Sequence, residues 1–302
     1  MLRRAFVAVL LTLAPLAGQP ARPPIVGIAH FALKTSDLTA ARAFYGRDLG
    51  FAELFTMDNP AGGGVLLALF KVNDHQYLEV RPELKDPAED RLSHLAFETT
   101  DARRLRDYLA AKGVAVPATL EPLRDGNLGF KVKDPEGRDI EFQQLLPGGM
   151  HAARFGQSMP ESRISARIIH AGLTVRDRAA ADRFWHDILG FEETWHGGRT
   201  DDAVDWVDMR VPEGTDWLEY MLNVRNPTPR TLGVMHHFGL GVPSVEAAHQ
   251  RLQQREVKMT ENPKIGRDGK WQLNLYDPDL TRVELMEPKP VQTPCCSPMK
   301  ME

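Results

Sequence analysis

The stretch KDPEGRDIEF at residues 133–142 returns, in altered form, as YDPDLTRVEL at residues 276–285. Each copy joins an Asp-Pro turn to a strand-like segment, and each places one glutamate, Glu141 or Glu284, between two apolar residues. A lone carboxylate in an enclosed apolar setting is costly unless it is paired or bound to a cation. The repeat therefore predicts a duplicated fold in which the same acid has a role in both copies.

Four strand-like stretches each contain a histidine within an alternating apolar pattern. They are IAHFALKTSD (28–37), LSHLAFETTD (92–101), IIHAGLTVRD (168–177) and MHHFGLGVPS (235–244). An amphipathic, helix-like segment follows each one, and then strand-like sequence broken by turn signals such as NPAGGG, RDGN and GRDGK. Self-similarity of this kind indicates repeated structural units. Each unit is predicted to contain a strand, a helix and about three further strands.

The units divide the chain into two domains with flanking segments. We expect a first domain at 25–146, a Gly- and Pro-rich linker at 147–165, a second domain at 166–288, and a disordered Pro-rich tail at 289–302. The tail contains the only two cysteines, Cys295 and Cys296, and adjacent cysteines cannot cross-link a fold. The domains must therefore depend on core packing or on a metal.

Residues 1–24 have the layout of an export signal. Two arginines precede an apolar stretch from Ala5 to Ala17, and small residues follow. This stretch is too short to span a bilayer comfortably, so we expect a periplasmic or secreted protein with no stable membrane span once the signal is cleaved. The net charge of −4 and the absence of a basic stripe argue against a nucleic-acid partner.

Four histidine–glutamate pairs share one of two spacings. The interval is 49 residues from His30 to Glu79 and from His170 to Glu219, and 47 residues from His94 to Glu141 and from His237 to Glu284. Because side chains alternate between the faces of a strand, the apolar neighbours of these residues would face the helix, and the imidazoles and carboxylates would face the other side.

The residue two positions after each of these histidines, on the same face, is alanine or glycine, which leaves open volume near the ring. Two imidazoles and two carboxylates on one curved sheet form a natural site for a divalent metal, whose charge the carboxylates balance. Any one of these histidines alone is more simply explained as a half-buried strand residue. The eight residues together, at matched spacings, favour a site.

In these motifs the chain resembles the vicinal oxygen chelate superfamily, which includes glyoxalase I, extradiol dioxygenases and bleomycin resistance proteins. The resemblance rests on the histidine strands, on FYGRDLGF (44–51) and FWHDILGF (184–191), and on the two closing strands, and it covers roughly residues 25–287. It implies an α+β fold of four βαβββ modules that form two cupped, barrel-like mixed sheets with helices on the outside. Which modules share a sheet is left open.

By this resemblance the metal ligands are His30, Glu79, His94, Glu141, His170, Glu219, His237 and Glu284. The resemblance implies one or two divalent transition metal ions per chain, chosen from Ni, Co, Zn, Mn and Fe(II). It also implies a substrate that chelates the metal through adjacent oxygens, and a ligand glutamate that acts as the base. The candidate bases are Glu79, Glu141, Glu219 and Glu284.

Three functions are compatible with this interpretation. The first is a glyoxalase-like isomerase or lyase acting on a small molecule other than a glutathione adduct, because glutathione is scarce outside the cell. The second is a non-haem Fe(II) extradiol-type dioxygenase using His170, His237 and Glu284, and the third is a binder that sequesters a small molecule. Extradiol dioxygenases of this superfamily have a histidine at about the position of Glu219 and a tyrosine at about the position of Asn274. This chain has neither residue at these positions.

Candidate substrate-binding residues lie in the second domain. They are Trp195, Arg199, Trp271 and Asn274, of which the arginine suits an anionic group. We expect a monomer or a homodimer.

Overall fold

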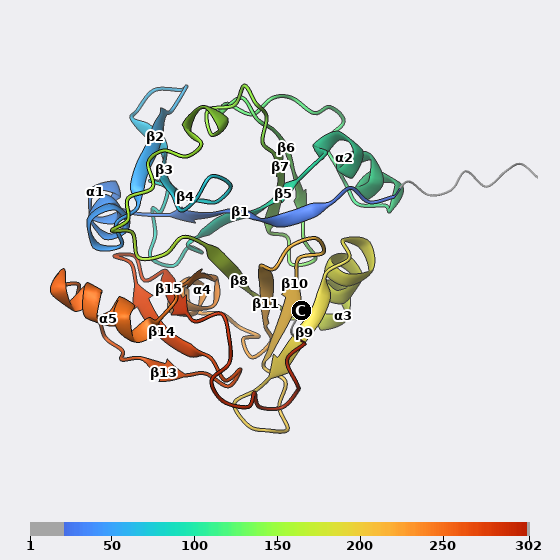
Figure 1. Ribbon diagram of the computed structural model, residues 1–302. Coiled ribbons are helices and arrows are strands. Elements are labelled where there is room, and N and C mark those ends of the chain that lie inside the picture. Colours follow the sequence, from blue (N-terminus) through green and yellow to red (C-terminus); the bar gives the residue numbers. More distant parts are fainter. Residues whose placement is uncertain (1–20, 301–302) are drawn as a thin grey trace, which may run out of the picture.

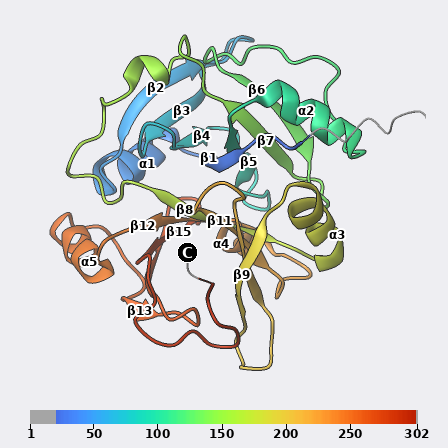
Figure 2. The ribbon, with the colours of Figure 1, turned by 45° about the vertical axis from the view of Figure 1, so that its right-hand side comes forward.

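The computed structural model describes residues 21–300, so residues 1–20, most of the signal-like segment, lie outside the described part of the chain. Two mixed sheets form the two halves of the molecule, with the first domain in blue to green and the second in yellow to red (Figure 1, Figure 2). Between residues 21 and 300, no helix combines the length and apolar character that crossing a bilayer requires.

The first sheet combines two modules in the strand order β2-β3-β4-β1-β5-β7-β6. Its first module contains β1 (Ile25–Lys34), α1 (Leu38–Arg42), the π-helical turn η1 (Ala43–Asp48), β2 (Ala52–Asp58), β3 (Val65–Lys71) and β4 (Tyr77–Arg81). Its second contains β5 (Leu92–Thr99), α2 (Ala102–Ala111), β6 (Leu128–Lys133) and β7 (Asp139–Gln144). The second module has two strands after its helix, and a single bridge between Pro122 and Leu128 stands where a third was expected.

The second sheet has the order β13-β14-β15-β12-β8-β11-β10-β9. Its first module contains β8 (Ile168–Thr174), α3 (Arg178–Asp182), the π-helical turn η3 (Arg183–Ile188), β9 (Glu192–Gly197), β10 (Trp206–Arg210) and β11 (Trp217–Met221). A short helix, α4 (Pro229–Met235), leads to the second module, which contains β12 (His237–Gly241), α5 (Val245–Gln254), β13 (Lys264–Ile265), β14 (Trp271–Tyr276) and β15 (Arg282–Met286).

Modules that are adjacent in the chain share a sheet, which settles the question that the sequence left open. The first strand of each module pairs antiparallel with the first strand of its neighbour, β1 with β5 and β8 with β12. Within each module the first strand pairs parallel with the last, as β1 does with β4. The helix supplies the crossover that a parallel pair requires.

Capping residues explain where the first helix of each domain begins and ends. The carboxylate of Asp37 accepts hydrogen bonds from the backbone N–H groups of Thr39 and Ala40, and Asp177 caps α3 in the same way. Gly50 and Gly190 follow the two helices with φ values of 78° and 79°, which favour glycine. The helix-like segments predicted after the first and third histidine strands are therefore confirmed.

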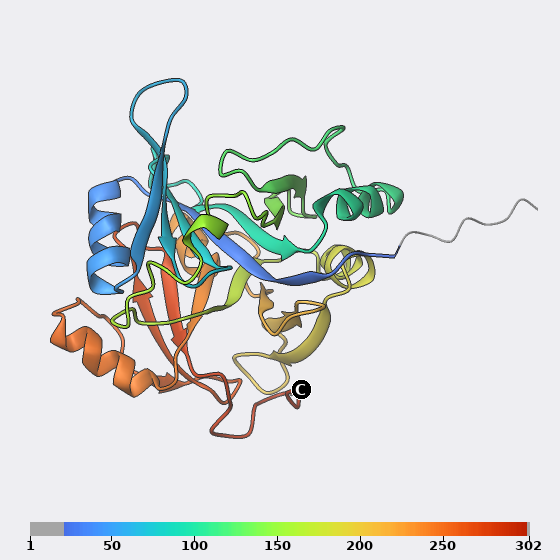
Figure 3. The same cartoon turned by 45° about the horizontal axis from the view of Figure 1, so that its top comes forward.

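The convex, apolar faces of the two sheets share one core. Phe31 of β1 contacts Phe238 of β12, with ring centroids 5.1 Å apart, and Phe97 of β5 contacts Trp185 of η3 at 5.6 Å. The helices also pair across the domains: Arg255 beyond α5 donates to the carbonyl of Asp48 in η1 (Figure 3). Since side chains alternate along a strand, the opposite, concave faces point away from each other. We call them the first cup and the second cup.

The repeated Asp-Pro turns hold the two domains together. Glu136, between β6 and β7, accepts the backbone N–H of Arg176 at 2.9 Å, just before α3. Asp279, between β14 and β15, accepts the backbone N–H of Ser36 at 3.0 Å, just before α1. Each turn of the opening motif therefore binds the backbone just before the other domain's first helix, a role that the sequence did not indicate.

The segments after the two domains fold back onto the sheets. The linker includes the 3-10 turn η2 (Ala152–Arg154), and the ring of its His151 stacks on Tyr77 with centroids 4.4 Å apart. The tail was expected to be disordered, but Trp195 Nε1 donates to the carbonyl of Cys295 at 3.1 Å and Lys300 N donates to the carbonyl of Thr194 at 2.9 Å.

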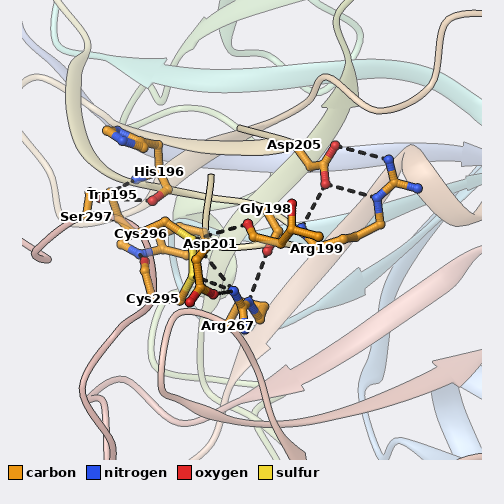
Figure 4. The surroundings of a disulfide bond; sticks show 11 residues. Trp195, His196, Gly198, Arg199, Asp201, Asp205, Arg267, Cys295, Cys296 and Ser297 are labelled. Atoms are coloured by element: carbon orange, nitrogen blue, oxygen red, sulfur yellow. Dashed lines mark hydrogen bonds and ion pairs between the residues drawn. A yellow bond between two sulfur atoms is a disulfide. The ribbon is translucent and has the colours of Figure 1, made fainter. Parts of the chain in front are cut away.

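The tail runs along β9, the edge strand of its sheet, and so satisfies backbone groups that would otherwise lack partners. Cys295 and Cys296 form a disulfide beside Arg267 and Asp201 (Figure 4). This bond joins adjacent residues and does not cross-link the fold.

Candidate metal centres

The four predicted ligands of the first domain come from four consecutive strands, β4, β1, β5 and β7. They are Glu79, His30, His94 and Glu141, and all four are buried. The Nε2 atoms of the two histidines lie 2.9 Å apart. Glu79 Oε2 is 4.0 Å from His30 Nε2, and Glu141 Oε2 is 3.5 Å from His94 Nε2. The structure thus brings residues from distant parts of the sequence to one point in the first cup.

The second cup repeats this arrangement on β11, β8, β12 and β15. The Nε2 atoms of His170 and His237 lie 3.2 Å apart. Glu219 Oε2 lies 3.2 Å from His237 Nε2, and Glu284 Oε2 lies 3.6 Å from the Nε2 atoms of both histidines. Glu219 therefore lies closer to an imidazole than Glu79 does, whereas Glu284 and Glu141 lie at similar distances from theirs.

These distances fit a divalent metal ion. Two nitrogen ligands each about 2.1 Å from an ion and at right angles to each other lie roughly 3.0 Å apart. Each cup contains a buried triad with one ligand atom per residue, all within 4.8 Å of one another: His30, Glu79 and His94 in the first, and His170, His237 and Glu284 in the second. The two triads are consistent with divalent metal binding, and nitrogen with oxygen donors suits first-row transition metals.

The small residues after the histidines turn out to lie opposite the partner histidine across the strand pair. His30 pairs with Ala96 and His94 with Ala32, while His237 pairs with Gly172 and His170 with Gly239. A Cβ atom added at Gly172 would lie 1.9 Å from Cε1 of His237. Strand alternation predicted that the small residue lies on the same face as the histidines. Only the pairing register shows that it makes room for the histidine of the partner strand.

Burial affects the protonation of the two centres differently. It lowers the pKa of His30 and His94 well below the usual value, which favours the neutral imidazole that binds metals. It also raises the pKa of Glu141 to about 7, although the nearby Lys131 opposes this shift. In the second cup, burial and Arg282 lower the pKa of His237, but hydrogen bonds to two carboxylates outweigh them and raise it.

Three cationic side chains next to the ligands were missed by the sequence analysis. Arg81 donates to Glu79 Oε1 at 2.7 Å, and Lys131 Nζ lies 3.4 Å from Glu141 Oε2. In the second cup, Arg282 Nη2 lies 2.6 Å from His237 Nε2. The arginines sit two residues from a ligand glutamate, so strand alternation could have placed them in the cups. Lys131 comes from a neighbouring strand and gives no such signal.

The structure places two of the four predicted substrate residues in the second cup. Trp195 and Asn274 line a cavity of about 310 Å³ that also includes His170, Glu219 and Glu284. Arg199 instead forms an ion pair with Asp205, 2.9 Å from Nε to Oδ2, and is not part of the cavity lining. Trp271 packs against the core. The first cup contains a cavity of about 250 Å³, for which the sequence proposed no substrate residues.

The sequence profile of the Glyoxalase/Bleomycin resistance protein/Dioxygenase superfamily matches this chain twice, at residues 27–142 and 167–285. The two matches cover both domains, and the chain belongs to this superfamily. This confirms the family resemblance and the predicted α+β fold of two cupped domains. No curated protein matches the sequence.

Solved structures of two kinds are similar in fold. The Mn(II)-bound glyoxalase from Novosphingobium aromaticivorans has a TM-score of 0.66 at 18% identity, with 88% of this chain and 83% of that chain covered. A variant of homoprotocatechuate 2,3-dioxygenase from Brevibacterium fuscum has a TM-score of 0.65 at 17% identity, with 90% and 74% covered. At this identity the likeness concerns the fold, and it does not distinguish the two activities.

Proposed function

We propose that this protein is an exported, metal-dependent, glyoxalase-like isomerase or lyase. The observation that supports this best is the set of two imidazoles and two carboxylates on four consecutive strands of each cup. A divalent ion held by these residues would supply the Lewis acidity that stabilises negative charge on two adjacent substrate oxygens. The small-molecule substrate would bind in the cavity that each cup encloses.

The protein's own groups provide the proton chemistry. A ligand glutamate would accept the proton from the hydroxyl-bearing carbon next to the carbonyl and return it to the carbonyl carbon, while the hydroxyl proton passes to the former carbonyl oxygen. In the first cup Glu79 is best placed for this, because its Oε2 is 4.0 Å from the nearest imidazole nitrogen and Arg81 holds its other oxygen. In the second cup the candidates remain Glu219 and Glu284.

The extradiol-type dioxygenase is a second candidate, supported by the His170, His237 and Glu284 triad and by the fold similarity to an enzyme of that kind. Two positions argue against it. Glu219, which occupies the place expected for a catalytic histidine, lies 3.2 Å from a ligand histidine. Asn274 occupies the place expected for a tyrosine, and the nearby Tyr276 donates to Glu261 at 2.6 Å and is outside the lining of the cavity.

Two assays separate these functions. Hydroxyacetone incubated with the metal-loaded protein in D2O should exchange its carbon-bound hydrogens if a base and a metal act on adjacent oxygens, as proton NMR would show. Catechol with Fe(II)-loaded protein should consume oxygen if the dioxygenase assignment is correct. A protein that purifies without metal and catalyses neither reaction would instead be a binder.

The proposed export rests on residues 1–24. Expression of the full chain in a Gram-negative host, followed by fractionation and N-terminal sequencing, tests it. A shortened chain outside the cytoplasm is expected, and a full-length chain retained inside would contradict the proposal.

A further inference from the structure

The two cups present their ligands on different walls. The residue paired with the first glutamate across the strands is Leu69 in the first cup, opposite Glu79, and Asp208 in the second, opposite Glu219. One strand further out, Phe55 pairs with Leu69, whereas Trp195 pairs with Asp208. The first of these two positions is therefore leucine in the first cup and aspartate in the second, and the other is phenylalanine in the first cup and tryptophan in the second.

The first cup has an apolar cluster that is separate from the main core. Leu67, Leu69 and Tyr77 are its buried members, and Phe55 and Met57 pack against them. We call Phe55, Met57, Leu67 and Leu69 the apolar wall. All four line the 250 Å³ cavity together with His30 and Glu79. An apolar surface that faces a cavity, next to buried polar ligands, is the usual composition of a small-molecule site.

Cationic groups line the same cavity. Lys131 lies 3.4 Å from Glu141 and its side chain is 42% exposed, so its ammonium group can also reach a bound molecule. Arg81 and Arg124 line the cavity as well. The first cup therefore combines a chelating centre, cations suited to a carboxylate and a patch suited to a hydrocarbon chain.

Resting on the proposed function, we propose that the first cup takes a short-chain 2-oxo or 2-hydroxy acid whose aliphatic chain lies on the apolar wall. The 2-oxygen and one carboxylate oxygen face the ligand set, and the other carboxylate oxygen lies near Lys131. In the second cup Asp208 stands in the place of Leu69, so the apolar wall is interrupted at that position.

The cavity sets the length of the chain. A water molecule occupies about 30 Å³ in the liquid, so 250 Å³ holds roughly eight waters, or a ligand of a similar number of heavy atoms. The acid 2-oxohexanoate has nine heavy atoms, close to this number, whereas pyruvate has the same head group and three fewer methylenes.

Calorimetric titration of the metal-loaded protein with each acid tests the inference. Burial of three additional methylenes should make 2-oxohexanoate bind roughly 50-fold more tightly than pyruvate. His30→Ala should abolish this preference, and His170→Ala should leave it unchanged. Equal affinity for the two acids, or a preference that survives His30→Ala, overturns the inference.

Wall and head-group variants sharpen the test. Met57→Gln should reduce the ratio of the affinity for 2-oxohexanoate to that for pyruvate about four-fold, which corresponds to the burial of one methylene. Met150→Gln, the same change at an exposed methionine outside the cavity lining, should leave it unchanged. Lys131→Met should weaken both acids to the same extent. Leu69→Asp places in the first cup the residue found at the matching position of the second, and it should make the affinities for the two acids equal. If Leu69→Asp does not fold, Met57→Gln still tests the inference.

Metal analysis of the same samples tests the proposed function separately. A first centre that holds metal but shows no chain-length preference contradicts only the inference about the wall. A chain that holds no metal contradicts the proposed function and, with it, the inference that rests on it.

Discussion

The first and second cups each contain two histidine and two glutamate ligands in the same arrangement, but the residues around the two ligand sets differ. Both ligand sets lie on four consecutive strands, with the histidines on the inner pair and the glutamates on the outer pair. The neighbours differ: Lys131 pairs with Glu141, whereas Asn274 pairs with Glu284. Strand order and side-chain alternation are enough to bring the ligands together, and they place no restriction on the identity of the cross-strand neighbours.

The largest expected effect that tests this comparison is on metal content. His30→Ala and His170→Ala each remove one imidazole, so each should lower the content from about two to about one equivalent per chain. Elemental analysis of protein purified without added metal measures this. A variant that keeps the wild-type content would show that its cup is not a metal centre, and the activity of the two variants identifies the catalytic cup.

Gly172→Ala should break the second centre through sterics alone. Its methyl group would lie 1.9 Å from Cε1 of His237, so the ring must move, at a cost of about 1–3 kcal/mol in the free energy of unfolding. Metal content should fall by about one equivalent. Ala96→Gly, the reverse change opposite His30, is the control and should keep both metals. An unchanged metal content in Gly172→Ala would contradict the position assigned to His237.

A third difference concerns the contact between the domains. Gln76 accepts the backbone N–H of Ile168 and Asp216 accepts that of Ile28, each at 2.9 Å, so a neutral and an acidic residue occupy matching places. Burial raises the pKa of Asp216 from 3.8 to about 6, with Arg167 opposing the shift. Folding therefore favours the protonated form of Asp216 relative to the unfolded chain.

Because this folded pKa is above the unfolded value, Asp216 stabilises the protein most below pH 3.8, and the contribution is lost as the pH rises through about 6. The loss is up to about 3 kcal/mol. Asp216→Asn should remove it, so the unfolding free energy of the variant relative to the wild type should increase between pH 4 and pH 7. Urea denaturation across this range measures the difference, and a constant difference would contradict the prediction.

The smallest expected effect concerns the tail. Removal of residues 289–302 takes away the hydrogen bond from Trp195 to Cys295, so tryptophan emission should shift to longer wavelength and the free energy of unfolding should fall by about 1 kcal/mol. The double variant Cys295→Ser, Cys296→Ser is the control, because Trp195 bonds to the backbone carbonyl. Equal emission from the truncated and full-length proteins would show that the tail does not cover Trp195.

Local rules accounted for much of the fold. The amphipathic segments after the first and third histidine strands located the first helix of each domain, and alternation assigned the histidines and glutamates to the concave faces. The same rules failed where the partner is distant in sequence. Composition suggested a disordered tail, yet Cys295 and Lys300 bond to the edge strand β9, and the linker's His151 stacks on Tyr77.

The sequence by itself determined the four modules, the face of each strand on which the ligands lie and the matched spacing of the two sets, because these follow from periodicity within short segments. Only the tertiary structure decided which modules share a sheet, which small residue accommodates which imidazole, and which cations and apolar groups surround each centre. Those features depend on hydrogen-bonding register between strands that are far apart in the chain, and no local pattern encodes that register.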